Sequence, residues 1–123
     1  MNVAFRPQTF WCRIRHTLHE TANLLAGPFN LSRCEFDYEN VFEWFEAKDV
    51  EGHSWNVSRK HNGDGEPSFD DYLIIKLTPV PTDTEEIGQK LSNALSCSVY
   101  FGEGWYDKDD SWKYVEQRGF TPS

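Results

Sequence analysis

The sequence predicts an α+β fold: a two-layer sandwich in which a mainly antiparallel sheet of four to five strands packs against two amphipathic helices, with a short C-terminal helix. Two observations indicate this fold. Segments whose apolar residues recur every three or four positions alternate with segments of two-residue period. In addition, 123 residues with 38% apolar and 15% aromatic side chains can bury one hydrophobic core but not two. We therefore expect one globular domain over residues 1–123.

The first expected element is an amphipathic helix from Thr9 to Ala26. Apolar residues follow one another at steps of three and four in this segment, which places them on one helical face. Gly27 and Pro28 come next and supply a stop signal. The predicted buried face consists of Trp11, Ile14, Leu18, Ala22 and Leu25.

Two strands are expected next. Residues 34–39 (CEFDYE) alternate apolar and acidic side chains, as a half-buried strand does. Residues 41–47 (VFEWFEA) carry bulky side chains on both faces, which favours a central position in the sheet. Turn-forming residues follow, and SWNVSRK at 54–60 resumes the two-residue period. The pattern therefore predicts a hairpin over residues 41–60.

The second half of the chain predicts a strand, a helix, a further strand and a short helix. Residues 71–79 (DYLIIKLTP) are rich in branched side chains and end at proline, which is typical of a strand. Thr82 and Glu85 have the spacing of a capping box at the start of a helix. CSVYF at 97–101 reads as the last strand, and the acidic start and basic end of residues 109–119 favour a short helix. The second helix should bury Ile87, Leu91, Ala94 and Leu95.

The net negative charge of the chain disfavours nucleic acids and anionic membranes as partners. The formal net charge is −8, and the excess is uneven: the first 34 residues carry +3 and the remainder −11. A potential of this sign repels phosphate backbones and anionic membranes and speeds encounter with a basic protein. No run of roughly 18–20 apolar residues could span a bilayer, and Arg6 and Pro7 interrupt any signal peptide. With three widely spaced cysteines, we expect a cytoplasmic protein with reduced thiols.

Several patterns raise the question of a metal or catalytic site. The loop RKHNGDGEPSFDD at 59–71 fails as a calcium loop, because alignment on Gly65 puts Lys60 at the first ligand position and Asp71 where glutamate is needed. Its Asn-Gly and Asp-Gly pairs indicate turns instead. No phosphate-binding, dinucleotide-binding or nucleophile motif is present. We expect no cofactor and no catalysis.

Two side-chain sets keep a metal-binding protein or metalloenzyme open as an alternative. On the predicted first helix, Cys12, His16 and His19 would form a stripe opposite the apolar face, with ligand types that suit zinc. Asp37, Glu46 and Lys48 fit the acid, acid-x-lysine pattern of magnesium-dependent nucleases. The neighbouring acids would repel a nucleic-acid substrate. A structural or self-associating subunit is the third alternative.

The strongest functional pattern is an acidic surface with aromatic residues. Seven acids lie between residues 35 and 51 among five aromatic side chains, and residues 103–112 repeat the mixture. Acids steer a basic partner and aromatic side chains anchor it, so this combination is typical of protein interfaces. The alternative is that the aromatic side chains belong to the core and the acids are solvated. The candidate partner-binding residues are Glu35, Asp37, Glu39, Glu43, Trp44, Glu46, Glu103, Trp105, Tyr106, Asp107, Asp109 and Asp110.

In size, acidity and segments such as FDYENVFEWFEAKD and SWNVSRKHNGDGEPSFDDYLIIKL, the chain resembles the small acidic bacterial immunity proteins of secreted antibacterial toxin systems. These proteins comprise many unrelated folds. The resemblance implies a non-enzymatic inhibitor that binds a cognate basic toxin, often a nuclease, and blocks its active site or an adjacent surface.

Overall fold

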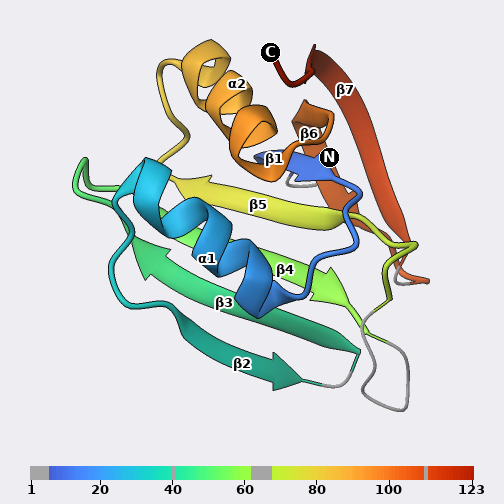
Figure 1. Cartoon of the computed structure of the whole chain (residues 1–123). Helices are drawn as coiled ribbons and strands as arrows, with labels where there is room; N and C mark the ends of the chain where they lie inside the picture. The colour runs from blue at the N-terminus through green and yellow to red at the C-terminus, as the bar shows by residue number, and fades with distance from the viewer. Residues whose placement is uncertain (1–5, 40, 62–67, 110) are drawn as a thin grey trace.

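The structure is a computed structural model that describes residues 6–39, 41–61, 68–109 and 111–123. These residues form one sheet of seven strands, in the order β2-β3-β4-β5-β1-β6-β7, and two helices that lie on the same side of it (Figure 1). Every pair of neighbouring strands is antiparallel. The elements are β1 (Gln8–Cys12), α1 (Leu18–Phe29), β2 (Glu35–Glu39), β3 (Phe42–Lys48), β4 (Ser54–Lys60), β5 (Leu73–Thr78), α2 (Thr84–Leu95), β6 (Val99–Tyr106) and β7 (Trp112–Phe120).

The predicted fold is wrong in strand number and helix number. A sandwich with four to five strands and three helices was expected, whereas the described residues form seven strands and two helices. Two segments that resemble helices in sequence are strands, namely β1 and β7. The hairpin over residues 41–60 and the strand within 71–79 are present as β3–β4 and β5. The coarse α+β class is correct.

The helix predicted from Thr9 to Ala26 is divided between β1 and α1. Phe10 and Cys12 point from β1 toward the helices, while Trp11 points to the opposite face, and all three are buried. Because Phe10, Trp11 and Cys12 are buried on both faces of this strand, apolar and polar residues do not alternate there, and the three- and four-residue spacing from Trp11 onward resembles a helix. The first helix begins only at Leu18.

Local hydrogen bonds set the ends of both helices. Thr17 and Glu20 form a capping box: the Thr17 hydroxyl accepts from the Glu20 amide, and the Glu20 carboxylate accepts from the Thr17 amide. The helix continues through Gly27 and Pro28 to Phe29 and stops at Asn30 in the left-handed conformation, with φ of 51°. The helix therefore ends three residues after Ala26, where the sequence predicts its end.

The second helix has a simpler start than the sequence predicts. Asp83 is the N-cap residue, and its side chain accepts from the Glu86 amide, so the expected pair of Thr82 and Glu85 does not form the capping box. Leu91 and Leu95 are buried as expected.

The main core lies between the helices and the face of the sheet that they cover, here called the helix face. Alternate residues of β1, β3, β4, β5 and β6 contribute buried side chains to it, whereas the edge strand β7 contributes Phe120 and the edge strand β2 contributes none. Both helices add leucines, and Phe29 packs on Trp55 with ring centroids 4.8 Å apart. The largest strand contributions are Phe10, Phe45, Trp55, Val57, Leu73, Ile75, Leu77, Val99, Phe101 and Phe120.

The opposite face of the sheet, here called the open face, is partly covered by the hairpin of β6 and β7. Trp11 is 1% exposed on this face and contacts the rings of Trp112 and Tyr114 at 6.0 and 5.2 Å. Gly104 makes room for this arrangement, because a Cβ at that position would lie 2.1 Å from the Trp112 ring. Residues 112–119 therefore lie in β7, which carries aromatic side chains onto the sheet, and the short helix predicted over this segment is wrong.

Candidate functional site

Four of the predicted acids gather on the open face at the β2 edge of the sheet. The register pairs Glu35 with Glu46, Asp37 with Trp44 and Glu39 with Phe42. Since side chains on a strand alternate between faces, these partners all point away from the helices. We call the set of Glu35, Asp37, Glu39 and Glu46, with Trp44 between them, the acidic edge.

The described residues supply no ion-pair partner to the acidic edge. Among the ion pairs of the described residues, none involves Glu35, Asp37, Glu39 or Glu46. Glu35 and Glu46 are direct cross-strand partners of like charge, an arrangement that disfavours folding. Lysines occur on the same face at Lys48 and, farther toward the middle of the sheet, at Lys60 and Lys76. The negative potential is therefore concentrated on β2 and the adjoining part of β3.

Glu43 is separate from the acidic edge. It is the direct cross-strand partner of Tyr38 on the helix face, and Arg59 is its partner on β4. The Arg59 side chain is fully buried and donates hydrogen bonds to the carbonyls of His16 and Ile14 at 2.7 and 3.3 Å. Burial lowers the pKa of Arg59, against the opposing effect of the Glu43 charge. Sequence reasoning missed this arginine, although it occupies an inward position of a two-residue pattern.

The second predicted acidic segment forms the tip of the β6–β7 hairpin. Tyr106 lies on the open face against Phe42 and Trp112, with ring centroids 5.0 and 5.2 Å away, so this ring is packed rather than free. Burial, with the nearby charge of Asp71, raises the pKa of Tyr106 to about 12. The contact with Phe42 brings the two predicted segments onto the same face of the sheet.

The other members of that segment have local roles. Glu103 pairs with Arg6 at 4.0 Å, and the Arg6 guanidinium lies 4.3 Å from the Trp105 ring centroid. Asp107 accepts from the Lys108 amide, and Asp109 accepts from the amide and hydroxyl of Ser111, whose side-chain hydrogen bond lowers the pKa of Asp109. Asp110 lies outside the described residues.

The two candidate metal sets do not form metal sites. Cys12 lies on β1, His16 in the connection after it and His19 on α1, so the predicted stripe on one helix is wrong. The Cys12 thiol hydrogen-bonds with Cys97, which together with burial raises the pKa of Cys12. Asp37, Glu46 and Lys48 share the open face. Within the described ranges, no three His, Cys, Asp or Glu side chains are grouped so that they could hold a metal ion.

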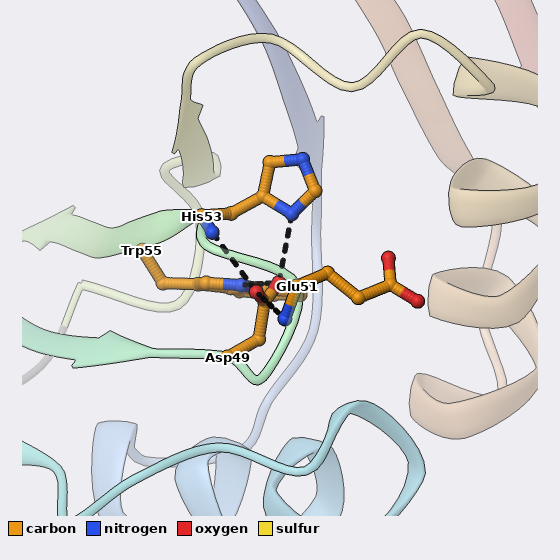
Figure 2. A network of polar contacts seen from close by, with 4 residues as sticks. All are labelled: Asp49, Glu51, His53 and Trp55. Carbon is orange, nitrogen blue, oxygen red and sulfur yellow. Dashed lines mark hydrogen bonds and ion pairs between the residues drawn. The ribbon is translucent and has the colours of Figure 1, made fainter.

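A compact polar network lies at the turn between β3 and β4 (Figure 2). Asp49 accepts from the amides of Glu51 and His53 with one oxygen, and from the Trp55 indole with the other, at 2.9–3.0 Å. The Nδ1 atom of His53 lies 3.0 Å from the second oxygen. Burial acts to raise the pKa of Asp49, but the hydrogen bonds from Trp55 and His53 outweigh it, and the pKa is lowered. This network fixes the hairpin turn and satisfies a buried indole.

The segment 59–71, which the sequence predicts as one loop, begins within strand β4 and ends in a hydrogen-bonded turn. Arg59 and Lys60 belong to β4, and residues 62–67 lie outside the described residues. Ser68 donates its hydroxyl to Asp71 at 2.7 Å, and the Asp71 amide returns to the Ser68 carbonyl at 3.2 Å. This end of the loop is a hydrogen-bonded turn, whereas the Asn-Gly and Asp-Gly pairs predicted as turns lie outside the described residues.

A hollow lies at β2 and β3, beside the start of α1. Its volume is about 570 Å³. His19 stacks on Phe36 along one wall, with ring centroids 3.8 Å apart and planes at 7°. It is lined by Thr17, Leu18, His19, Phe36, Asp37, Tyr38, Glu43, Trp44 and His61.

The described part of the chain contains no helix that is long and apolar enough to cross a membrane. Comparisons with protein families, with curated proteins and with solved structures find no match to this chain.

Proposed function

We propose that this protein is a non-enzymatic inhibitor of the immunity type, which neutralises a basic toxin domain by binding it through the acidic edge. The observation that carries this proposal is the alignment of Glu35, Asp37, Glu39 and Glu46 on one face, where none of them forms an ion pair with another described residue. A concentrated negative potential accelerates encounter with a basic surface, and Trp44 among the acids offers an aromatic contact.

The like-charge pair of Glu35 and Glu46 supports a binding role over a purely solubilising one. Solubility needs net charge but no particular placement, whereas two carboxylates directly opposite one another reduce the stability of the fold. Binding of a cationic surface between them would turn this repulsion into attraction. The edge also disfavours self-association through β2, because a second copy would bring its acids against these.

The test compares two variants of equal net charge. In Glu35→Gln/Asp37→Asn/Glu39→Gln/Glu46→Gln, the acidic edge is neutral. The matched control, Glu51→Gln/Asp70→Asn/Glu86→Gln/Glu116→Gln, removes four exposed charges elsewhere. Each protein is used to recover binding partners from cells that produce it, and the recovered protein is purified for rate measurements.

We expect the native protein and the control to recover a protein with a basic domain, and the edge variant to associate with it about tenfold more slowly at low salt. The native complex should also reduce that protein's toxic activity. Recovery of an acidic or neutral partner, or equal association rates for the two variants, would contradict the proposal.

A further inference from the structure

The hollow beside the start of α1 borders the acidic edge, since Asp37 and Trp44 contribute to its lining, but Tyr38 and Glu43 belong to the helix side of the sheet. Tyr38 and Glu43 are direct cross-strand partners, so the ring and the carboxylate stand next to each other on the helix side. Tyr38 is 75% exposed, whereas Phe36 is 38% exposed, stacks on His19 and lies 5.4 Å from Phe45 between ring centroids. The hollow therefore presents an exposed aromatic ring, in edge contact with His61 at 6.5 Å between ring centroids, beside the Glu43 carboxylate.

The Glu43 carboxylate is partly removed from water. Its Oε1 atom has no contact with solvent and no hydrogen-bond partner among the described residues. Arg59 lies opposite in register, but its two terminal nitrogens donate to the carbonyls of His16 and Ile14, and the described residues contain no ion pair between Arg59 and Glu43. A partly desolvated carboxylate attracts a second cation more strongly than one fully in water.

From this geometry we propose that the hollow is a cation-binding site that takes an arginine side chain of the partner, with the guanidinium over the Tyr38 ring and its N–H groups donating to Glu43. A planar guanidinium stacks on an aromatic ring and donates to a carboxylate at the same time, which an ammonium group does less well. A hollow of about 570 Å³ has room for this side chain.

This assignment rests on the proposed function for the origin of the arginine. Together with the acidic edge, it implies that a basic partner contacts both sides of β2 at the margin of the sheet. The acids of the open face would guide approach, and the hollow would hold one side chain in a fixed orientation. Affinity and specificity would then depend on different residues of the same strand pair.

The test needs no partner protein. Isotope-labelled protein is titrated with N-acetyl-arginine amide, and with N-acetyl-citrulline amide as an uncharged probe of nearly the same shape, while amide chemical shifts are recorded. We expect saturable shifts at His19, Phe36, Tyr38 and Glu43 with the arginine probe and at least tenfold weaker binding of the citrulline probe. Equal responses to both probes, or no response at these residues, would overturn the assignment.

Two substitutions test the role of each side chain in binding the arginine probe. Glu43→Gln should weaken the arginine probe about tenfold or more, and Tyr38→Leu, which changes an exposed ring and leaves the core intact, should weaken it several-fold. Glu35→Gln/Glu39→Gln/Glu46→Gln, which removes acidic-edge charges but leaves every lining residue of the hollow unchanged, serves as control and should bind the probe within about twofold of the native protein at physiological salt.

The two proposals fail in different ways. Loss of probe binding with an intact dependence of partner association on the acidic edge removes the arginine site alone. Normal probe binding without any basic partner removes the proposed function alone. Unchanged probe affinity in Tyr38→Leu would also contradict the site, since that variant does not depend on the structural role of Glu43.

Discussion

Glu35 of β2 and Glu46 of β3 are direct cross-strand partners on the open face, and neither forms an ion pair among the described residues. Replacing one of these acids by a base should therefore help folding. We expect Glu35→Lys to raise the free energy of unfolding by about 0.2–1 kcal/mol, measured by urea denaturation. Glu51→Lys, an exposed change at a turn, is the control and should alter it by less than about 0.5 kcal/mol. A lower free energy of unfolding for Glu35→Lys would contradict this prediction and indicate that the native protein already offsets the repulsion between Glu35 and Glu46.

Arg59 supports the connection between β1 and α1. Arg59→Met should lower the free energy of unfolding by about 3–5 kcal/mol, because it leaves the carbonyls of Ile14 and His16 without these donors and removes the cation closest in register to Glu43. The double variant Arg59→Met/Glu43→Gln should lose less than the sum of the single changes, since the unbalanced carboxylate is gone. Additive losses in a double-mutant cycle would show that Arg59 and Glu43 act independently.

Asp49 should control both hairpin stability and acid resistance. Asp49→Asn places amide hydrogens near the Trp55 and His53 donors, so we expect a loss of about 2–3 kcal/mol by thermal or urea unfolding. Glu51→Gln, in the same turn, is the matched control and should be nearly neutral.

The lowered pKa of Asp49 also predicts a pH dependence. Its carboxylate stabilises the fold above the ordinary value of 3.8, and this contribution is lost as the pH falls through the lower pKa of the folded state. The native protein should therefore lose stability in this acidic range more steeply than Asp49→Asn. Parallel acid unfolding curves for the two proteins would contradict this explanation.

Tyr106 predicts the opposite behaviour at high pH. Because burial raises its pKa from 10 to about 12, the unfolded chain loses this proton first, and the stability contribution declines between these values. Tyr106→Phe keeps the ring contacts with Phe42 and Trp112 but has no proton to lose. Its unfolding free energy should fall less between pH 10 and 12, and ultraviolet titration should lack the tyrosinate step of highest pKa.

The sequence predicts the middle of the chain well because local signals and tertiary packing agree there. Trp55 and Val57 alternate with polar residues, Asp49 and Gly52 provide a turn, and the branched residues of β5 favour a strand. The predictions for β1 and β7 are wrong for different reasons. β1 is buried on both faces and so lacks alternation, whereas the acidic start and basic end of residues 109–119 suggest a helix dipole. The alternation of Trp112 and Tyr114 was the available signal for β7.

The candidate surface was predictable in composition but not in geometry. The alternation in EFDYE already separates Glu35, Asp37 and Glu39 from Phe36 and Tyr38. The cross-strand register, which assigns Glu46 to the acids and Glu43 to the tyrosine, depends on how β2 and β3 align. The burial of Arg59 was not readable, because its acceptors are backbone carbonyls more than 40 residues away in the chain.

The place of β1 in the sheet has a consequence for biosynthesis. This early strand is hydrogen-bonded between β5 and β6, whose residues follow it by 60 positions or more. A nascent chain leaving the ribosome can form the β3–β4 hairpin from neighbours, but β1 must wait until both late strands have been synthesised. Trp11 and Phe10 stay uncovered in the meantime, so chaperone binding during translation should concentrate on this segment.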